Sequence, residues 1–421
     1  MIRRVRIDGY KSLQNIELEL SQLTLIIGPN ATGKSNLFDA LRLLSRIVMS
    51  RSLQEAFDEH RGDPIEAFSY SGGGLEALLQ KEKVTFTIGV DIELSQGVKS
   101  RTEQLIERYL SPSHKATKRR HPKRYNISES FLRYRISISI TPKTGTLRVE
   151  DEELLVFEGT WDSHPGHDNN IRTIIEKVGN QFYLWMDGQD SPIEYEEGLD
   201  YAIVSQPIYP PYGPYLIALR EELASWQLYY LEPRLMREAS PLKESDTITH
   251  SGGDLASFYW TLQRKNPGQF HNIEKSLQTF IHTIDGIKVE LTNEGYLRLK
   301  VKEDGIEHYA KLVSDGTLRL LALLAIFSPQ NPASIIGIEE PENGVHPRRL
   351  RLLARLLQNA SEKRQIIVNT HSALLPDYFG NEKIGIVQCF KKDGRTHFQV
   401  LRPNGIEGVL SSERILTSDR V

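Results

Sequence analysis

The fold of this chain is decided by nine residues near its start, Gly28-Pro29-Asn30-Ala31-Thr32-Gly33-Lys34-Ser35-Asn36. They match the pattern G-x-x-x-x-G-K-[ST] in full. The two glycines let backbone N–H groups turn inward around an anion. Lys34 can then reach the β- and γ-phosphates of a nucleotide, and the Ser35 hydroxyl can ligate Mg²⁺. The stretch therefore predicts a phosphate-binding loop.

The residues on both sides of this loop support that interpretation. The apolar run 24–27 predicts a buried strand, and the apolar spacing over 36–44 predicts a helix that continues to about residue 49. Bound phosphates would then lie at a helix N-terminus, where the N–H groups and the helix dipole favour negative charge. Two further strands are expected upstream, at about 2–8 and 14–20.

Composition limits the classes of protein that remain. The chain has 421 residues, enough for one large core or for two to three domains. Its net charge of −3 means that nucleic acid could be bound only through a local basic patch. The single cysteine, Cys389, excludes an intramolecular disulfide and a thiolate metal cluster. No signal-peptide core or membrane-length apolar run is evident. We therefore expect a cytoplasmic protein without a membrane partner.

The middle of the chain has a different character from its ends. Strict alternation over 84–94 and 132–140, with shorter patterns near 147–157 and 181–186, predicts that residues 80–200 are rich in antiparallel β-structure. Helical patterns follow between 214 and 285, at 215–231, 254–264 and 272–284, and a hairpin is expected over 287–301. These patterns predict a discontinuous head of residues 1–78 and 300–421, with an inserted lobe at 79–299.

Two carboxylates follow an apolar strand near the other end of the chain. The strand covers 334–338 and leads directly into Glu339 and Glu340. In a P-loop enzyme the first acid holds Mg²⁺, usually through water, and the second acts as general base for the attacking water. We expect these roles for Glu339 and Glu340 respectively. Taken alone, two glutamates in this position are more often a solvated loop.

A second candidate helix N-terminus lies upstream of those acids. Ser314, Asp315, Gly316 and Thr317 precede the apolar run 318–327, and three of the four are N-capping residue types, while Gly316 allows close approach of a ligand. One interpretation is a capped helix of the core. The other is a helix tip that contacts the nucleotide of a partner subunit.

A further strand, at about 364–369, ends in Thr370-His371-Ser372. A histidine at a strand end is often structural or simply exposed. In this context His371 is instead placed to sense a γ-phosphate through a hydrogen bond.

In this order the motifs resemble those of the ABC-type ATPase heads of the RecF, SMC and OLD group, and specifically their short predicted-ATPase relatives. The opening R-I-D-G-Y-K-S-L-Q-N-I-E-L and the segment L-E-P-R-L-M-R-E at 231–238 add to the similarity. The resemblance is strong over 1–45 and 310–375. It implies an α/β P-loop head, with a β-rich and helical insertion between the phosphate loop and the signature segment 314–317.

The resemblance also implies cofactors and an assembly. Two subunits would enclose two ATP molecules with Mg²⁺, and each signature segment would contact the γ-phosphate held by the other subunit's loop. A homodimer or a higher assembly of dimers is therefore expected. Such families also use a glutamine that senses Mg²⁺, for which Gln80 is the one candidate, and His346 lies where the family makes contacts across subunits.

The biological output has two candidate interpretations. OLD nucleases continue into a TOPRIM domain, which the 49 residues after Ser372 do not contain. We therefore expect an ATPase that acts as sensor or regulator in a bacterial antiphage defence system and controls a separate nuclease or toxin. The alternative is a RecF-like DNA repair or maintenance ATPase that clamps duplex DNA. The basic cluster 115–124 could contact DNA or RNA, although such charge runs are usually solvated loops.

Two enzyme classes are disfavoured. A small-molecule P-loop kinase does not need the signature helix or His371, and an ABC transporter subunit would carry a different signature and no large insertion.

Overall fold

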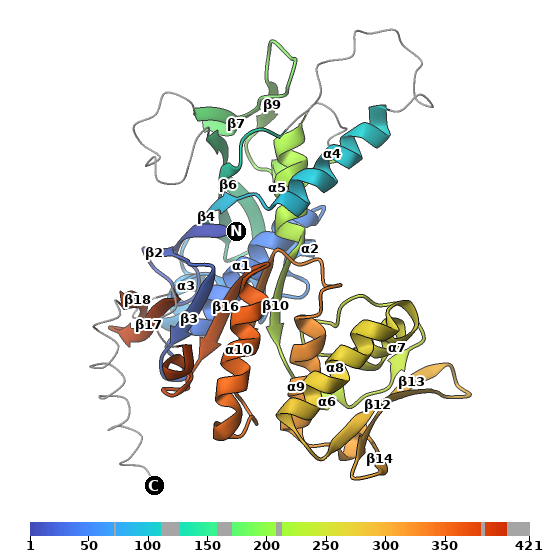
Figure 1. Cartoon of the computed structure of the whole chain (residues 1–421). Coiled ribbons are helices and arrows are strands. Elements are labelled where there is room, and N and C mark those ends of the chain that lie inside the picture. The colour runs from blue at the N-terminus through green and yellow to red at the C-terminus, as the bar shows by residue number, and fades with distance from the viewer. Residues whose placement is uncertain (71–72, 111–126, 158–170, 208–212, 380–383, 402–421) are drawn as a thin grey trace. The chain divides into compact units, whose positions relative to one another are not determined.

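The computed structural model describes residues 1–70, 73–110, 127–157, 171–207, 213–379 and 384–401 (Figure 1). The chain divides into two units. Unit one contains Met1–Ser21, Pro29–Trp226 and Cys389–Gln399, and unit two contains Gln22–Gly28, Gln227–Gln388 and Val400–Val421. No helix in the described ranges combines the length and the hydrophobicity needed to cross a bilayer.

Unit one is built on an eight-stranded antiparallel sheet with the order β2-β1-β4-β5-β6-β7-β8-β9. The predicted alternation holds best in β4 and β5, which pair along their lengths, with the buried Ile88 opposite the buried Ile136. The strands are β1 (Ile2–Asp8), β2 (Ile16–Glu19), β4 (Val84–Glu93), β5 (Phe131–Thr141), β6 (Thr146–Phe157), β7 (Ile171–Val178), β8 (Gln181–Leu184) and β9 (Ile193–Glu196). Because β1 pairs with β4, one sheet holds strands from both sides of the predicted boundary at residue 78. The predicted division into head and lobe stays a prediction.

The helices of unit one pack against one another and include one that the sequence patterns did not indicate. Helix α1 (Lys34–Met49) follows the phosphate loop as predicted and packs on α5 (Pro214–Ala224), which also contacts α4 (Gln96–Leu110). We did not expect α4, because its sequence is dominated by polar residues. The shorter helices are α2 (Leu53–Phe57), η1 (Pro64–Ala67), α3 (Gly74–Leu79) and η3 (Ile203–Ser205).

One predicted helix is too long. The expected helix 215–231 ends at Ala224, and Trp226–Tyr230 forms strand β10. The N–H of Ser225 closes the last turn on the carbonyl oxygens of Glu221 and Glu222. The aromatic residues that follow favour an extended backbone when a sheet edge is available, which an amphipathic pattern does not reveal. Helix α8 likewise covers Pro267–Phe280, not 272–284, because the Asn266 side chain caps its start.

The central sheet of unit two carries the strands that end at the candidate site. Its order is β10-β15-β16-β3-β17-β18, and the neighbours β15 (Ile335–Glu339), β16 (Gln365–Thr370) and β3 (Leu23–Ile27) are parallel. All residues of these three strands are buried, as expected for strands covered on both faces. Strand β17 (Gly385–Lys392) pairs in parallel with β3 through its first four residues. The end of β17 and most of β18 (Arg395–Leu401), from Cys389 to Gln399, belong to unit one.

Parallel pairing brings three predicted motifs to one edge of this sheet. Ile27 lies opposite Thr370, and Asn369 lies opposite Glu339. Gly28, Glu340 and His371 follow these strands directly, so the first residue of the phosphate loop, the second acid and the histidine all lie at the carboxyl edge of the same sheet.

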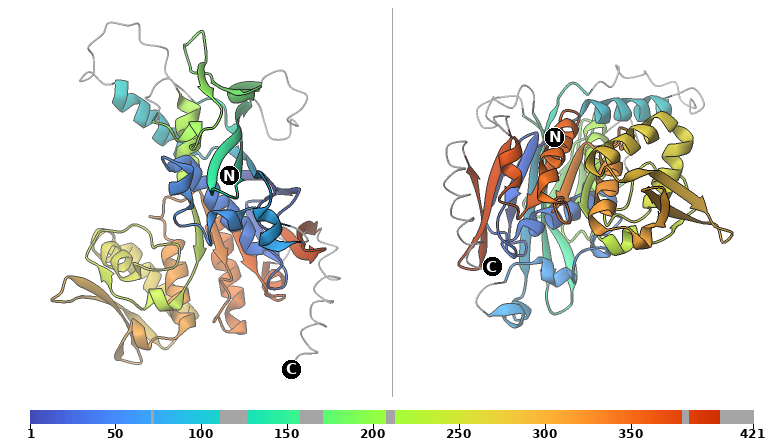
Figure 2. Two further views of the ribbon diagram at one scale, coloured as in Figure 1. Left: turned by 180° about the vertical axis from the view of Figure 1, so that it is seen from behind. Right: turned by 60° about the horizontal axis from the view of Figure 1, so that its bottom comes forward.

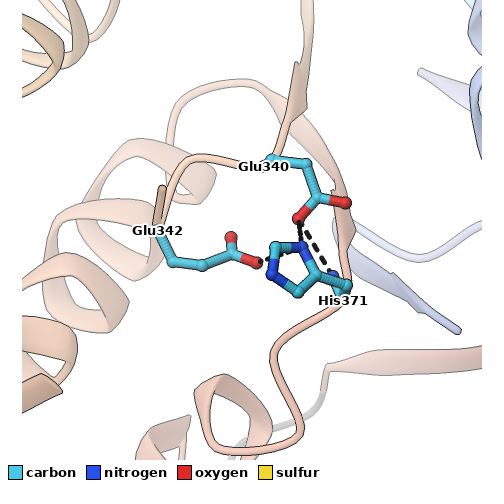
Figure 3. Close-up of side chains that lie close together, drawn as sticks. All are labelled: Glu340, Glu342 and His371. Atoms are coloured by element: carbon cyan, nitrogen blue, oxygen red, sulfur yellow. Dashed lines mark hydrogen bonds and ion pairs between the residues drawn. The ribbon is translucent and has the colours of Figure 1, made fainter. Parts of the chain in front are cut away.

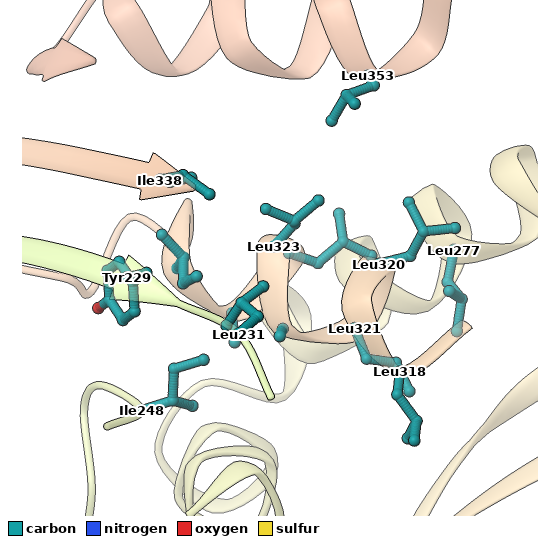
Figure 4. Close-up of a cluster of buried hydrophobic side chains, with 14 of the residues drawn as sticks. Tyr229, Leu231, Ile248, Leu277, Leu318, Leu320, Leu321, Leu323, Ile338 and Leu353 are labelled. Atoms are coloured by element: carbon teal, nitrogen blue, oxygen red, sulfur yellow. The ribbon is translucent and has the colours of Figure 1, made fainter. Parts of the chain in front are cut away.

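The rest of unit two surrounds a hydrophobic core centred on α9 (Asp315–Ile326). Apolar side chains of α9, the central sheet and neighbouring helices meet there (Figure 4). Helices α7 (Leu255–Lys265) and α8 pack on a small antiparallel sheet of β12 (Ile284–Leu291), β13 (Tyr296–Glu303), β14 (Ile306–Tyr309) and β11 (Ser240–Pro241). Helix α10 (Leu350–Ser361) packs on β16 and β3 (Figure 2). Short elements are α6 (Pro233–Met236), η4 (Ala310–Leu312), η5 (Pro347–Arg349) and η6 (Leu375–Phe379).

Candidate functional site

The phosphate loop connects β3 to α1, and its backbone is left-handed at one of the two motif glycines and at one residue that was not expected. Ala31 (φ 63°) and Gly33 (φ 103°) are both left-handed. Lys34 is only 6% exposed, and its Nζ donates a hydrogen bond to the Pro29 carbonyl at 2.9 Å, where the Thr32 hydroxyl also donates. Lys34 therefore points back across its own loop, which is the position from which an ammonium group can meet a bound phosphate.

A layer of hydroxyl groups that we did not predict supports this loop from behind. The Thr396 hydroxyl donates to the Thr32 carbonyl at 2.7 Å, and it also pairs with the Ser12 hydroxyl at 2.6 Å. A Cβ at Gly33 would lie 2.0 Å from Thr396 Oγ1, so no residue larger than glycine fits there. The Asn36 side chain donates to Ser12 at 2.8 Å. Sequence motifs could not reveal Thr396, because it is 364 residues away from Thr32.

The start of α1 suits an anion. Its N-cap is Gly33, which offers no side-chain cap, and its first turn contains no acidic residue. No carboxylate of the first turn of α1 neutralises the positive end of the helix dipole, and a phosphate is the natural complement. Ser35 lies in this first turn. Gln80, the glutamine predicted to sense Mg²⁺, is exposed at the end of α3, and its role stays a prediction.

In unit two, the backbone at Glu340 turns sharply as it leaves β15. Glu340 has a φ of 48°, a rare conformation for a residue with a side chain. Its N–H donates to the Asn369 carbonyl at 2.8 Å and so extends the β15–β16 pairing by one residue. The preceding Glu339 is buried, at 7% exposure. The two adjacent acids thus lie in different environments, and the roles expected for them stay predictions.

The side chain of Glu340 is held by His371. Its Oε2 accepts the backbone N–H of His371 at 3.0 Å and also makes a close contact with the ring Nδ1 (Figure 3). The two residues predicted as general base and phosphate sensor are therefore in direct contact, although 31 residues separate them.

A third acid, Glu342, completes this cluster and was not predicted. Its Oε1 accepts the Thr370 hydroxyl and lies 3.7 Å from His371 Nδ1, while Oε2 is buried without a hydrogen-bond partner among the described residues. Burial, together with the neighbouring carboxyl group of Glu340, raises the pKa of Glu342 to about 8. Its place in the run E-E-P-E was the only signal in the sequence.

Ligand atoms of Glu340, Glu342 and His371 all lie within 4.8 Å of one another. A proton shared between the buried carboxyl group of Glu342 and the half-buried one of Glu340 would satisfy both, and a divalent cation would use the same three atoms.

The signature segment starts α9 as a capped helix. The Ser314 hydroxyl accepts the Thr317 N–H at 3.2 Å, which confirms the predicted capping. Asp315 is bonded by the guanidinium of Arg237, and the same nitrogen donates to the Val313 carbonyl at 2.9 Å. Arg237 belongs to the segment 231–238 that carries part of the family resemblance, but its contact with the signature was not predicted.

Gly316 packs directly on the loop that follows the acids. A Cβ at Gly316 would lie 2.1 Å from the Gly344 carbonyl oxygen. Gly344 itself has a φ of 75°. Backbone therefore meets backbone here, and any side chain at Gly316 would push the two segments apart. His346, just beyond, caps η5 by accepting the Arg348 N–H at 3.2 Å. The basic cluster 115–124 lies outside the described residues.

Comparison with known proteins places the chain in a family. Residues 23–377 match the family described as "AAA domain, putative AbiEii toxin, Type IV TA system". An "ATP/GTP phosphatase" of Helicobacter pylori is 23% identical over 88% of this chain and 85% of its own length. A "Retron Vc95 probable ATPase" of Vibrio cholerae is 20% identical over 92% of this chain and 73% of its own length.

Solved structures agree on the fold. The crystal structure of an Smc head bound to the C-winged helix domain of ScpA has a TM-score of 0.55 and 14% identity, and covers 97% of this chain and 99% of its own. An Smc head from Pyrococcus furiosus, bound to the C-terminal domain of ScpA, has a TM-score of 0.54 and 13% identity, with coverage of 98% and 99%. The chain therefore belongs to the matched AAA-domain family, has the ABC-type P-loop fold of SMC heads, and is a nucleotide-binding ATPase.

Proposed function

We propose that this ATPase works as a Mg²⁺-dependent dimer whose ATP cycle controls a separate effector in a bacterial antiphage defence system. The observation that carries the catalytic part is the single sheet edge of unit two, from which the phosphate loop starts and at which Glu340 and His371 touch. The retron and toxin–antitoxin names among its relatives support the defence part.

The phosphate loop supplies the charge stabilisation. Lys34 and the backbone N–H groups of residues 28–36 would stabilise negative charge that develops on the phosphates during transfer to water. The Ser35 hydroxyl and the buried Glu339 carboxylate are hard oxygen donors of the kind that Mg²⁺ prefers, so the residues present fit this ion. Gln80 is the third candidate. The ion would neutralise phosphate charge when bound.

Glu340 is the proposed general base, and His371 the phosphate sensor. A carboxylate at Glu340 can accept a proton from water, and its two bonds to His371 fix where the carboxylate points. His371 would exchange its contact with Glu340 for one with the γ-phosphate. The base would then be released only when a triphosphate is present.

The signature segment is the proposed contact with a second subunit. Ser314, Asp315, Gly316 and Thr317 form an exposed or half-buried helix start, which is available to the nucleotide of another copy. Two such contacts related by a two-fold axis would close a dimer around two nucleotides.

The test is the substitution Glu340→Gln, with Glu362→Gln at the exposed end of α10 as control. We expect the first variant to bind ATP, to form an ATP-dependent dimer in light scattering, and to hydrolyse ATP at least about a hundredfold more slowly. The control should match the wild type. Full turnover by Glu340→Gln would disprove the assignment of the base.

The effector role has its own test. Cells carrying this chain with its neighbouring reading frames should resist phage, and Lys34→Ala should abolish that resistance. The RecF-like alternative predicts salt-dependent, sequence-independent binding to duplex DNA that is lost when residues 115–124 are neutralised. Binding of that kind, without phage resistance, would replace the defence proposal by DNA maintenance.

A further inference from the structure

A cavity of about 420 Å³ lies in unit two beside the signature segment. Its size is within the range of pockets that bind ligands in proteins. It is lined by the segment after α6, by β13, and by the end of β14 with η4, namely Arg237, Glu238, Ala239, Arg298, Leu299, Tyr309, Ala310, Lys311 and Leu312.

The cavity coincides with a break in the pairing of β13. On one edge, β13 pairs with β11 at Tyr296 and Leu297, and with β14 from Lys300 onward. Between them, Arg298 and Leu299 have no paired strand on that edge within the described chain. One of these two residues directs its N–H and C=O groups to that edge, so the gap offers an entering peptide one pair of main-chain hydrogen bonds.

The charge of the lining is predominantly positive. Arg237, Arg298 and Lys311 face a single acid, Glu238. Lys311 makes no ion pair within the part of the chain that the structure describes, and Arg298 has only Glu294, at 4.0 Å. A ligand with several carboxylates would be complementary to this lining.

The rim of the cavity is apolar and exposed. Leu312 is 77% exposed and Tyr309 is 39% exposed. Tyrosine and arginine are enriched where protein partners bind, and the exposed Leu312 adds apolar surface beside them.

We propose that this cavity binds an extended acidic segment of a partner protein, with one large apolar side chain of that segment inside it. The gap in β13 would take the backbone, the three cations would take the acids, and Leu312 with Tyr309 would cover the apolar side chain. That the partner is the effector chain rests on the proposed function, whereas the binding itself does not.

Arg237 links this site to the signature. The same guanidinium that lines the cavity bonds the Asp315 carboxylate and the Val313 carbonyl. A carboxylate in the cavity would compete with Asp315 for Arg237. Binding of the segment would therefore change the start of α9 and, with it, the rate of ATP hydrolysis.

The experiment is selection of a random-peptide phage library on the full-length chain, with Arg298→Glu/Lys311→Glu as the disabled variant. Lys275→Glu/Arg355→Glu, at exposed positions of α8 and α10, is the charge-matched control. We expect acidic peptides with one bulky apolar residue to be enriched. They should bind the double variant about tenfold more weakly than the control, and their binding should change the ATPase rate of the wild-type chain. The double variant should keep its basal ATPase rate.

Three results would overturn the proposal. The first is a selection that enriches no acidic peptides, and the second is enriched peptides that bind the double variant as tightly as the control. The third is loss of the ATP-dependent dimer when both cavity substitutions are added to Glu340→Gln, which would show that a second copy covers this surface. If the peptides bind but the wild-type cavity never supports an ATP-dependent dimer of Glu340→Gln, the peptide site stands and the proposed dimeric ATP cycle is wrong.

Discussion

Replacing Glu342 by glutamine should stabilise the protein, and increasingly so as the pH rises. The folded chain raises the pKa of Glu342 from 4.5 to about 8, because the carboxyl group is buried and lies next to Glu340. Between these values the folded state keeps a proton that the unfolded state releases, so stability falls as the pH rises from 4.5 to about 8 and is level above. Each pH unit is worth about 1.4 kcal/mol, which makes the whole cost at most roughly 5 kcal/mol.

Glutamine removes this cost because it cannot ionise. Its amide can still accept the Thr370 hydroxyl, and its NH₂ group can donate to Glu340 in place of the shared proton. The variant and the wild type should therefore have similar stability near pH 4.5, and the variant should be more stable near pH 8.

The assay is thermal unfolding across this pH range, in a chelating buffer so that bound cations do not contribute. The difference in Tm between Glu342→Gln and the wild type should grow with pH and then level off. Glu362→Gln, exposed in the same unit, should show no such trend. A constant difference, or one that shrinks as the pH rises, would refute the protonated state that the geometry implies.

Three further substitutions test separate contacts. Gly316→Ala places a methyl group 2.1 Å from the Gly344 carbonyl oxygen, so it should reduce ATP hydrolysis at least about tenfold in a steady-state assay while ATP binding persists. Gly268→Ala, where the added methyl group has no neighbour closer than 3.8 Å, should match the wild type. Arg237→Ala should lower kcat without changing ATP affinity, because it removes the contact with the start of α9, and Arg237→Lys should recover part of the lost kcat. Arg234→Ala is the control and should have no effect. Weaker ATP binding by Arg237→Ala, with kcat unchanged, would show that Arg237 acts on nucleotide binding and not on turnover. Thr396→Val removes the donor to the Thr32 carbonyl and should weaken ATP binding about fivefold by calorimetry, and unchanged affinity would show that the loop does not need this support.

Much of the fold was predictable because local patterns determine it. The phosphate loop, the strands before it and the helix after it follow from glycine placement and apolar spacing, and the meeting of Gly28, Glu340 and His371 follows once their strands are parallel neighbours. Strand β10 was missed because aromatic residues in a short run suit either a helix or a sheet edge, and only a distant partner strand decides between them.

The supporting contacts of the site could not be predicted from the sequence. Thr396 reaches Thr32, and Arg237 reaches Asp315, across long separations in the chain, and neither residue belongs to a motif that specifies its partner. Glu342 was visible as an acid in a loop, yet its burial depends on how β15 and β16 align. Such contacts depend on tertiary packing, which hydrophobic periodicity does not encode.

The most direct test of the proposed ATP cycle is a structure of Glu340→Gln with ATP and Mg²⁺. We expect one nucleotide whose γ-phosphate contacts both the Lys34 ammonium group and the side chain at position 340, with Ser314 of a second copy on its far side. A nucleotide held by residues 28–36 while position 340 lies on a separate surface would contradict it.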